Sequence, residues 1–305
     1  MTRLNPIIKR EIEIKSRSLT LPVMMTVMNA VLFAVGLAGV SAEILRMRVS
    51  YTLNYGAFLE IYAAVIMLQY VLVLFTAPVF TADCIAGERE RGTFDLLLTT
   101  QLTARDIVFE KFASALVSMS VLIVSGLPAM LVPLMFGGVY IQSTVFIMFV
   151  MIIEAAEIMS IGMLASSFCR TSVQSIAVSY AVLAAMTIGP FIISGAAGVF
   201  VPDGENELIY LTVIDPLLPI AALLSKQTGE GTELLDVLFR LMGGTPDAGF
   251  VKHAALIGIM VQTAISFACI LVSVMHIMPR RNPLKNKQKS LLGFVEKDKN
   301  RGYNK

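Results

Sequence analysis

Residues 112–153 form a run of 42 residues that contains no Asp, Glu, Lys or Arg. About 20 apolar residues suffice to cross the hydrocarbon core of a bilayer, so this run is long enough for one crossing and much of a second. The chain of 305 residues is 56% hydrophobic and only 15% charged, whereas soluble domains are about 25% charged. These features exclude an ordinary soluble enzyme and a disordered chain, and they predict an all-α integral membrane protein.

Six apolar segments each approach or exceed the length of a transmembrane helix. Gly137 and Gly138 divide the long run, and Gly189-Pro190 is expected to kink the fifth helix. The first segment is too long for the apolar core of a signal peptide, so a retained helix is predicted. The predicted spans are about 18–42, 58–83, 110–135, 141–168, 172–200 and 253–279, within a transmembrane domain of residues 1–279.

Lysine and arginine residues are distributed unevenly between the two sides of these spans. One side has Arg3, Lys9, Arg10, Lys15, Arg17, Arg89, Arg91, Arg105, Lys111, Arg170 and nine residues after 279, and the other has only Arg46, Arg48, Lys226, Arg240 and Lys252. Positive charge accumulates in the cytoplasmic flanks of membrane helices. Both termini are therefore predicted to be cytoplasmic.

Three segments outside the spans have their own patterns. Residues 4–17 predict an amphipathic helix on the membrane surface, with an ordinary solvated N-terminus as the alternative. Residues 203–252 form the largest loop, on the outer side, where apolar stretches interrupted by Asp215, Pro216 and Pro219 predict short or re-entrant helices, and 232–242 has a helical pattern. Residues 280–305 predict a basic cytoplasmic tail near an anionic membrane face. An arm that binds nucleic acid is the rival interpretation. We favour the membrane-facing tail and therefore expect no nucleic-acid partner.

Candidate catalytic and metal-binding residues are scarce. Cys84, Cys169 and Cys269 are too few and too scattered for a disulfide framework. His253 and His276 alone argue against a histidine-based metal site. The sequence therefore predicts no catalytic residue and no metal site.

The loop between the second and third spans carries the most distinctive pattern. A run of alternating charge over 88–91 precedes Gly92, which permits a sharp turn. A short amphipathic helix then has Phe94, Leu97 and Leu98 on one side, and Thr103 with Asp106 predicts a capping-box start for the third span. Such a helix suits the docking of a cytoplasmic partner, and the alternative is that it lies at the lipid interface.

This loop resembles the signature of the ABC type-2 transporter permeases, the membrane-spanning subunits of ATP-binding cassette exporters. The resemblance is carried by Glu88, Arg89, Glu90, Gly92, Thr93, Asp95, Leu96, Leu97 and Lys111. It extends to the six spans, the N-terminal helix and the long outer segment. The basic tail has no counterpart that we can assign.

The resemblance implies a permease that moves its substrate with energy from a separate ATPase subunit. Residues 88–100 would form the coupling helix, with Glu88, Arg89, Glu90, Arg91, Gly92, Thr93, Phe94, Asp95, Leu97 and Leu98 meeting that subunit. Two six-helix units, identical or related, would work with two ATPase copies in a prokaryotic plasma membrane. The chain has no Gly-x-x-x-x-Gly-Lys-Ser/Thr motif, so ATP and magnesium would bind to the partner and no cofactor to this chain.

Two carboxylates are predicted near the middle of the fourth span. Glu154 and Glu157 share one helix face with Ser160 nearby. A charge at this depth costs about 2.5–3.5 kcal/mol, so these side chains should avoid lipid. They either line the translocation path or the face between permease units, which favours a cationic or polar substrate, or they are protonated and hydrogen-bonded to neighbouring helices.

Two other functional classes are alternatives to the exporter permease. A stand-alone secondary transporter would show an internal repeat between halves, and no convincing repeat is present. An intramembrane enzyme could use the Glu154-Ala155-Ala156-Glu157 segment, but no His lies near the middle of a span. Copurification of an ATPase distinguishes the permease from both alternatives.

Overall fold

The computed structural model describes residues 19–51, 55–94, 103–137, 140–200, 207–228 and 248–277. Four predicted features lie outside these ranges: the surface helix of 4–17, the signature residues 95–100, the helical pattern of 232–242 and the basic tail of 280–305. The described ranges contain helices and no strand.

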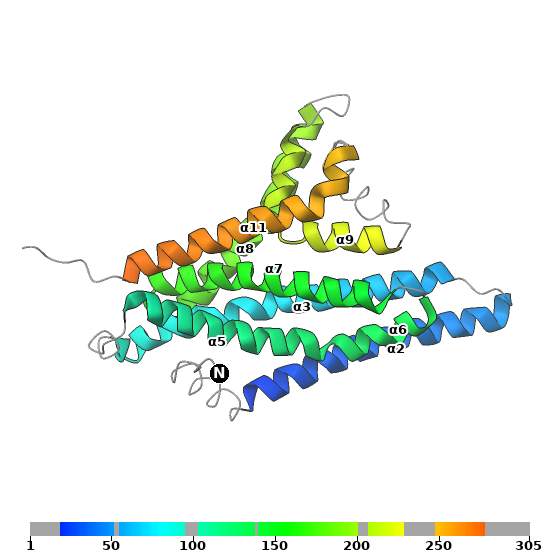
Figure 1. Ribbon diagram of the computed structural model, residues 1–305, viewed down its shortest axis with the longest axis horizontal. Coiled ribbons are helices and arrows are strands. Elements are labelled where there is room, and N and C mark those ends of the chain that lie inside the picture. Colours follow the sequence, from blue (N-terminus) through cyan, green and yellow to red (C-terminus); the bar gives the residue numbers. More distant parts are fainter. Residues whose placement is uncertain are drawn as a thin grey trace, which may run out of the picture.

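Within the described ranges, seven helices form an elongated bundle (Figure 1). They are α2 (Thr20–Ser50), α3 (Tyr55–Glu90), α5 (Ala104–Ser125), α6 (Leu127–Gly137), α7 (Ile141–Phe168), α8 (Ser172–Phe200) and α11 (Ala248–Ile277), and the shorter elements are the 3-10 helix η1 (Glu207–Ile214) and α9 (Leu218–Thr228). Six segments are long and apolar enough to cross a membrane, with α5 and α6 together making the third. The predicted all-α fold with six spans is confirmed.

The helix α7 forms the centre of the bundle. It packs most extensively against α3 and α11, and Ile147, Met151 and Ile158 on it are fully buried. The outer helices instead leave large apolar side chains exposed, among them Val27 on α2 and Phe267 on α11. Exposed apolar side chains on long helices are expected where lipid is the surrounding solvent.

The third span contains a break that the sequence prediction missed. A single helix over 110–135 was expected, but α5 ends at Ser125 and α6 begins at Leu127. Pro128 has no N–H and cannot donate to the carbonyl four residues earlier, so the helix is interrupted there. At the break, Gln69 of α3 donates to the Ile123 carbonyl at 2.8 Å, and a Cβ at Gly126 would lie only 2.5 Å from Gln69 Oε1.

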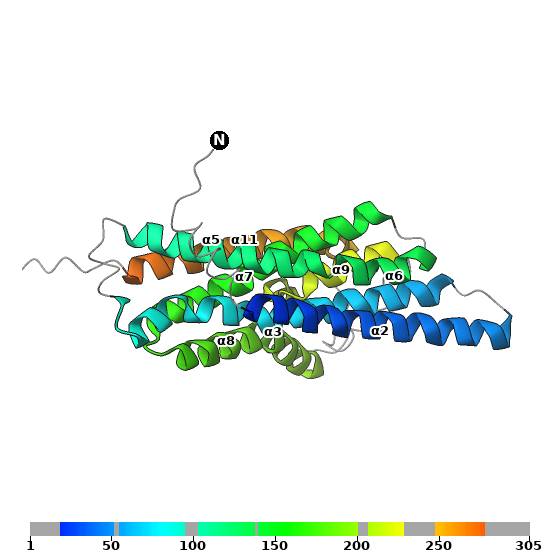
Figure 2. The same ribbon diagram turned by 90° about the horizontal axis from the view of Figure 1, so that it is seen from below.

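The first two spans extend beyond their predicted ends. Apolar runs suggested 18–42 and 58–83, whereas α2 continues to Ser50 and α3 to Glu90. The extensions carry charges that find partners: Glu43 pairs with Arg46 at 3.6 Å on α2. A helix of 31 residues is about 46 Å long, so its last turns reach past the hydrocarbon core of about 30 Å. Figure 2 shows α2 running alongside α3.

The start of α5 matches its prediction. Thr103 Oγ1 accepts a hydrogen bond from the Asp106 amide at 3.3 Å, and Asp106 Oδ2 accepts one from the Thr103 amide at 3.0 Å. This reciprocal pair is the predicted capping box.

The segment between α8 and α11 returns toward the bundle. Figure 1 shows α8, which contains Pro190, turning away toward its C-terminal end. After it, η1 packs on α8 and α11, and α9 lies beside α11 and α7. Leu218 and Ile220 at the start of α9 are fully buried. The short helices expected over 203–252 are therefore present within 207–228, and α11 already begins at Ala248.

Candidate functional site

The charged residues 88–91 close α3 at one end of the bundle, which we call the signature end. The starts of α5 and α8 and the ends of α7 and α11 also lie there (Figure 1). Gly92 follows with φ of +70°, a left-handed conformation that glycine adopts without strain. Its amide donates to the Arg89 carbonyl at 3.1 Å, and the Thr93 amide donates to the Glu88 carbonyl at 2.9 Å.

This geometry corrects the predicted start of the coupling helix. The resemblance implied a coupling helix over 88–100, but Glu88, Arg89 and Glu90 belong to the last turn of α3, and the turn lies at Gly92, where the residue pattern predicted it. The turn comprises Arg91 and Gly92, and Phe94 is again in a helical conformation. Asp95, Leu96, Leu97 and Leu98 lie outside the described residues.

Glu88 connects α3 to α5. Its Oε1 accepts from Lys111 Nζ at 3.1 Å, and its Oε2 accepts from the Thr93 hydroxyl. Thr93 thus donates its hydroxyl back to the last turn of α3. Both charged side chains are largely covered, 25% and 13% exposed, so water screens this pair less than an open surface pair.

Arg89 connects α3 to the end of α7. One of its guanidinium nitrogens, Nη1, donates to the Ser167 carbonyl at 2.6 Å and to the Cys169 carbonyl at 3.1 Å. The last carbonyls of a helix have no intrahelical donor and carry partial negative charge, so a cation there is stabilising. The guanidinium carbon also lies 5.0 Å from the centre of the Phe94 ring, a distance suited to a cation–π interaction. Arg89 therefore touches both the end of α7 and Phe94, the residue that follows the turn.

Glu90 connects α3 to the start of α8. Its Oε2 accepts from the Ser172 amide at 2.9 Å and from the Ser172 hydroxyl at 2.8 Å. A carboxylate at a helix N-terminus is favoured by the helix dipole. Arg91 pairs with Asp83 at 3.5 Å, but both side chains are exposed, so this pair adds little stability.

The two carboxylates predicted in the fourth span are enclosed by the chain itself. Glu154 and Ser160 are 0% exposed and Glu157 is 1% exposed, so none of them lies on an outward face where a second permease unit could contact it. Among the described residues, the four carboxylate oxygens have no hydrogen-bond partner. The Ser160 hydroxyl donates to the Glu157 carbonyl at 2.6 Å, not to a carboxylate. The predicted hydrogen bonds to neighbouring helices are therefore absent from the described part of the chain.

A third buried carboxylate, Asp215, joins this group from the turn between η1 and α9. It is 1% exposed, and it lies near enough to Glu154 and Glu157 for their charges to interact. Burial raises the pKa of Asp215 to about 7, although the hydrogen bond from the Leu217 amide acts in the opposite direction. We call Glu154, Glu157 and Asp215 the buried carboxylates.

Polar groups from two more helices line the same region. The Tyr70 hydroxyl of α3 is buried, has no partner among the described residues and lies within electrostatic range of all three carboxylates. Gln262 of α11 donates to the Asp215 carbonyl at 3.0 Å. In the sequence, Asp215 stands out only as an interruption of an apolar stretch, and nothing in that stretch indicates contact with the fourth span.

No set of three His, Cys, Asp or Glu side chains within the described ranges is arranged to hold a metal ion. The buried carboxylates are thus a dispersed acidic group inside an apolar bundle. Buried polar groups in proteins are usually hydrogen-bonded, so unpartnered groups of this kind mark a candidate site.

Comparison with known proteins agrees with the six spans and the signature loop. The family model described as ABC-2 family transporter protein matches residues 18–276, which covers the first five spans and the sixth up to residue 276. A search of curated proteins finds no match. Members of this family are transport components and not themselves enzymes. The chain belongs to the ABC-2 family of transporter proteins, as a multi-pass membrane permease.

Proposed function

We propose that this chain is the permease subunit of an ATP-binding cassette exporter and that its signature end meets a separate ATPase subunit. The observation that carries the proposal is the set of contacts made by Glu88, Arg89 and Glu90 with α5, α7 and α8. Three spans are thereby held by residues that directly precede the proposed short helix with Phe94, Leu97 and Leu98, which we call the loop helix. A force on that loop would reach all three helix ends.

Of these three connections, the one that leads from the loop helix to α7 is the shortest. Phe94 opens the loop helix and lies against Arg89, which holds the last carbonyls of α7. The helix α7 carries Glu154 and Glu157, two of the three buried carboxylates. Movement of the loop on ATP binding would therefore shift the helix that bears these groups.

Docking would rest on the apolar side of the loop helix. Leu97 and Leu98 would insert into a groove on the ATPase, because buried apolar anchors provide most of the energy of such contacts. ATP and magnesium would bind to that partner, in two copies, beside a second permease unit that is identical or related. Both termini would face the cytoplasm in a prokaryotic plasma membrane.

The buried carboxylates are proposed to belong to the translocation path, together with Ser160. Three acidic groups without a described cationic partner favour a cationic or polar substrate. The path would then pass between α3, α7, α11 and the η1–α9 turn, which surround these groups.

Two measurements test the proposal: copurification of an ATPase subunit with the permease, and the ATP hydrolysis of that subunit in proteoliposomes. A tagged permease should retain an ATPase subunit and stimulate its hydrolysis, and Leu97→Asp should lower both at least 10-fold because it would bury a charge at the contact. Leu97→Met keeps an apolar side chain and should behave as wild type. Stand-alone function, as in a secondary transporter, is indicated if no ATPase accompanies the wild-type protein.

A further inference from the structure

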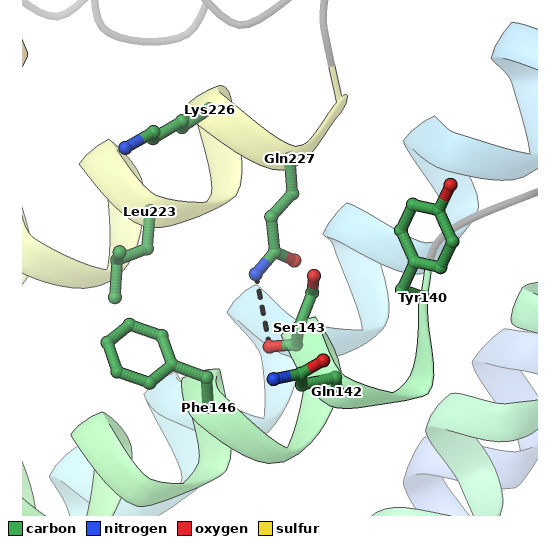
Figure 3. A pocket seen from close by; sticks show the side chains of 7 residues that line it. All are labelled: Tyr140, Gln142, Ser143, Phe146, Leu223, Lys226 and Gln227. Carbon is green, nitrogen blue, oxygen red and sulfur yellow. Dashed lines mark hydrogen bonds between the residues drawn. The ribbon is translucent and has the colours of Figure 1, made fainter.

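An open cavity of about 600 Å³ lies at the end of the bundle opposite the signature end. The first turns of α7 and the last turns of α9 form its walls (Figure 3). The lining side chains are Tyr140, Gln142, Ser143, Phe146, Leu223, Lys226 and Gln227. The cavity thus combines one cation, several hydroxyl and amide groups and two apolar side chains.

Hydrogen bonds hold the two walls together. Gln227 Nε2 of α9 donates to the Ser143 carbonyl of α7 at 3.1 Å, as Figure 3 shows. The Tyr62 hydroxyl of α3 lies 3.4 Å from Gln227 Oε1 and 2.9 Å from Thr144 Oγ1. Because Tyr62 and Thr144 are each 1% exposed, these bonds fix the distance between the walls from inside the bundle. A preformed cavity loses less entropy on binding than a flexible surface.

The cavity favours negative charge. Lys226 makes no ion pair with the described residues, and the lining has no Asp or Glu. The N-terminus of α7 adds to this field, because Tyr140 provides no side-chain cap and the first turn has no acidic residue. The Gln142 amide offers a further donor beside it.

The depth of the cavity corresponds to the headgroup region of a bilayer. The 28 residues of α7 span about 42 Å, and the hydrocarbon core measures about 30 Å, so the terminal turns extend into the headgroups. Tyr140 at this level is 82% exposed, as tyrosines at membrane interfaces are. Below it, Phe146 and Phe149 are 49% and 60% exposed and continue the cavity wall as an apolar strip along α7.

We propose that this cavity binds one anionic phospholipid, whose phosphate lies between Lys226 and Gln142 and whose acyl chain follows Phe146 and Phe149. Charge complementarity selects the headgroup, and the exposed apolar strip accommodates the chain. The site is separate from the buried carboxylates and from the signature end. Lipid binding there would hold α9 against α7, and with it the turn that carries Asp215.

Native mass spectrometry of the full-length permease in a neutral detergent tests this site, with phosphatidylglycerol, phosphatidylcholine and inorganic phosphate as probes. The wild-type protein should retain one phosphatidylglycerol at least 10-fold more tightly than phosphatidylcholine. Lys226→Gln should weaken this binding about 5-fold, as expected for one cation near the headgroups, and Lys226→Arg should preserve it. Arg48→Gln, which removes another exposed cation outside the cavity, should leave it unchanged.

Equal losses in Lys226→Gln and Arg48→Gln would mean diffuse charge attraction and would overturn the proposal. Equal affinity for the two lipids, or displacement of the lipid by an equal concentration of inorganic phosphate, would also overturn it. Each protein is checked by its melting temperature, and Lys226 is exposed, so loss of the fold is not expected. No ATPase is present in the measurement, and its outcome is therefore independent of the proposed coupling.

Discussion

Gly162 and Thr81 meet where α7 crosses α3, and a methyl group at Gly162 would overlap the Thr81 hydroxyl. Overpacking of this kind costs about 1–3 kcal/mol in a well-packed core. Gly162→Ala should therefore lower the melting temperature in detergent, and Thr81→Ala in the same chain should restore most of the loss by removing the obstructing oxygen. Gly189→Ala is the matched control, because nothing lies within 4 Å of its added Cβ. A penalty equal in both glycine variants would contradict this account of the crossing.

Cys269 reports on the region around the buried carboxylates. It lies on α11 within hydrogen-bond reach of Ser160 and is partly exposed. If water enters this region during ATP turnover, a membrane-impermeant thiol reagent should label Cys269 at least 3-fold faster than at rest, in a chain with Cys84 and Cys169 replaced by Ser. Glu154→Gln with Glu157→Gln should suppress the increase, since neutral amides hold less water than carboxylates.

Glu60→Gln on α3 is the control, because Glu60 is exposed. In this variant Cys269 should be labelled at the same rate as in the wild-type protein. Labelling that is insensitive to turnover and to the double substitution would remove the buried carboxylates from the translocation path. They would then be neutral groups enclosed during folding.

Glu154, Glu157 and Ser160 could be predicted from the sequence, because their depth follows from their position along one helix. The proximity of Asp215 and Tyr70 to them could not be predicted, because it depends on how the η1–α9 turn returns to α7 and on how α3 packs against α7. In the same way, the charges at 88–91 were interpreted as a surface for a partner. Their contacts with Lys111 and Ser172 depend on neighbouring helix ends that spacing alone does not specify.

At the scale of elements, the end of α3 acts as a junction between helices. Arg89→Gln should leave ATPase copurification intact but lower ATPase stimulation about 10-fold, because it removes the charged donor to the Ser167 and Cys169 carbonyls of α7. Charge-assisted hydrogen bonds of this type contribute about 1.5–3 kcal/mol. Stimulation and copurification are measured on the same proteoliposome preparations.

Arg170→Gln is the control for this prediction. Arg170 is exposed at the same end of the bundle and makes no ion pair with any described residue, so its loss should change neither quantity. If both variants lower ATPase stimulation equally, stimulation depends on the net charge at the signature end and not on the hydrogen bonds from Arg89 to α7.

The six long helices were predictable from apolar runs alone, but their ends and breaks were not. Runs without charge end at residue 82, yet α3 continues to Glu90 because its charges bond to α5, α7 and α8. The break at Gly126 is the opposite case, because here the apolar run continues although the helix ends. Hydropathy continues through Pro128, and the Gln69 side chain that donates to the Ile123 carbonyl at the break comes from another helix.

At the scale of the whole molecule, the uneven distribution of lysine and arginine predicts that both ends of the chain lie in the cytoplasm. In a chain without Cys84, Cys169 and Cys269, a cysteine at position 230 should react with an impermeant thiol reagent added outside intact cells. A cysteine at position 290 should react only after the membrane is opened. The reversed pattern would place the signature end outside and would exclude docking of a cytoplasmic ATPase.

The polar side chains of α3 also have a consequence for the order of assembly during synthesis. Gln69, Tyr70 and Thr81 are buried in the finished bundle, yet the later helices that pack on α3, chiefly α5 to α8, emerge from the ribosome afterwards. A newly inserted α3 would expose these groups to lipid at a cost. The second span is therefore expected to wait beside the insertion machinery until the fourth arrives, so that this membrane protein is completed as a cluster of helices and not one helix at a time.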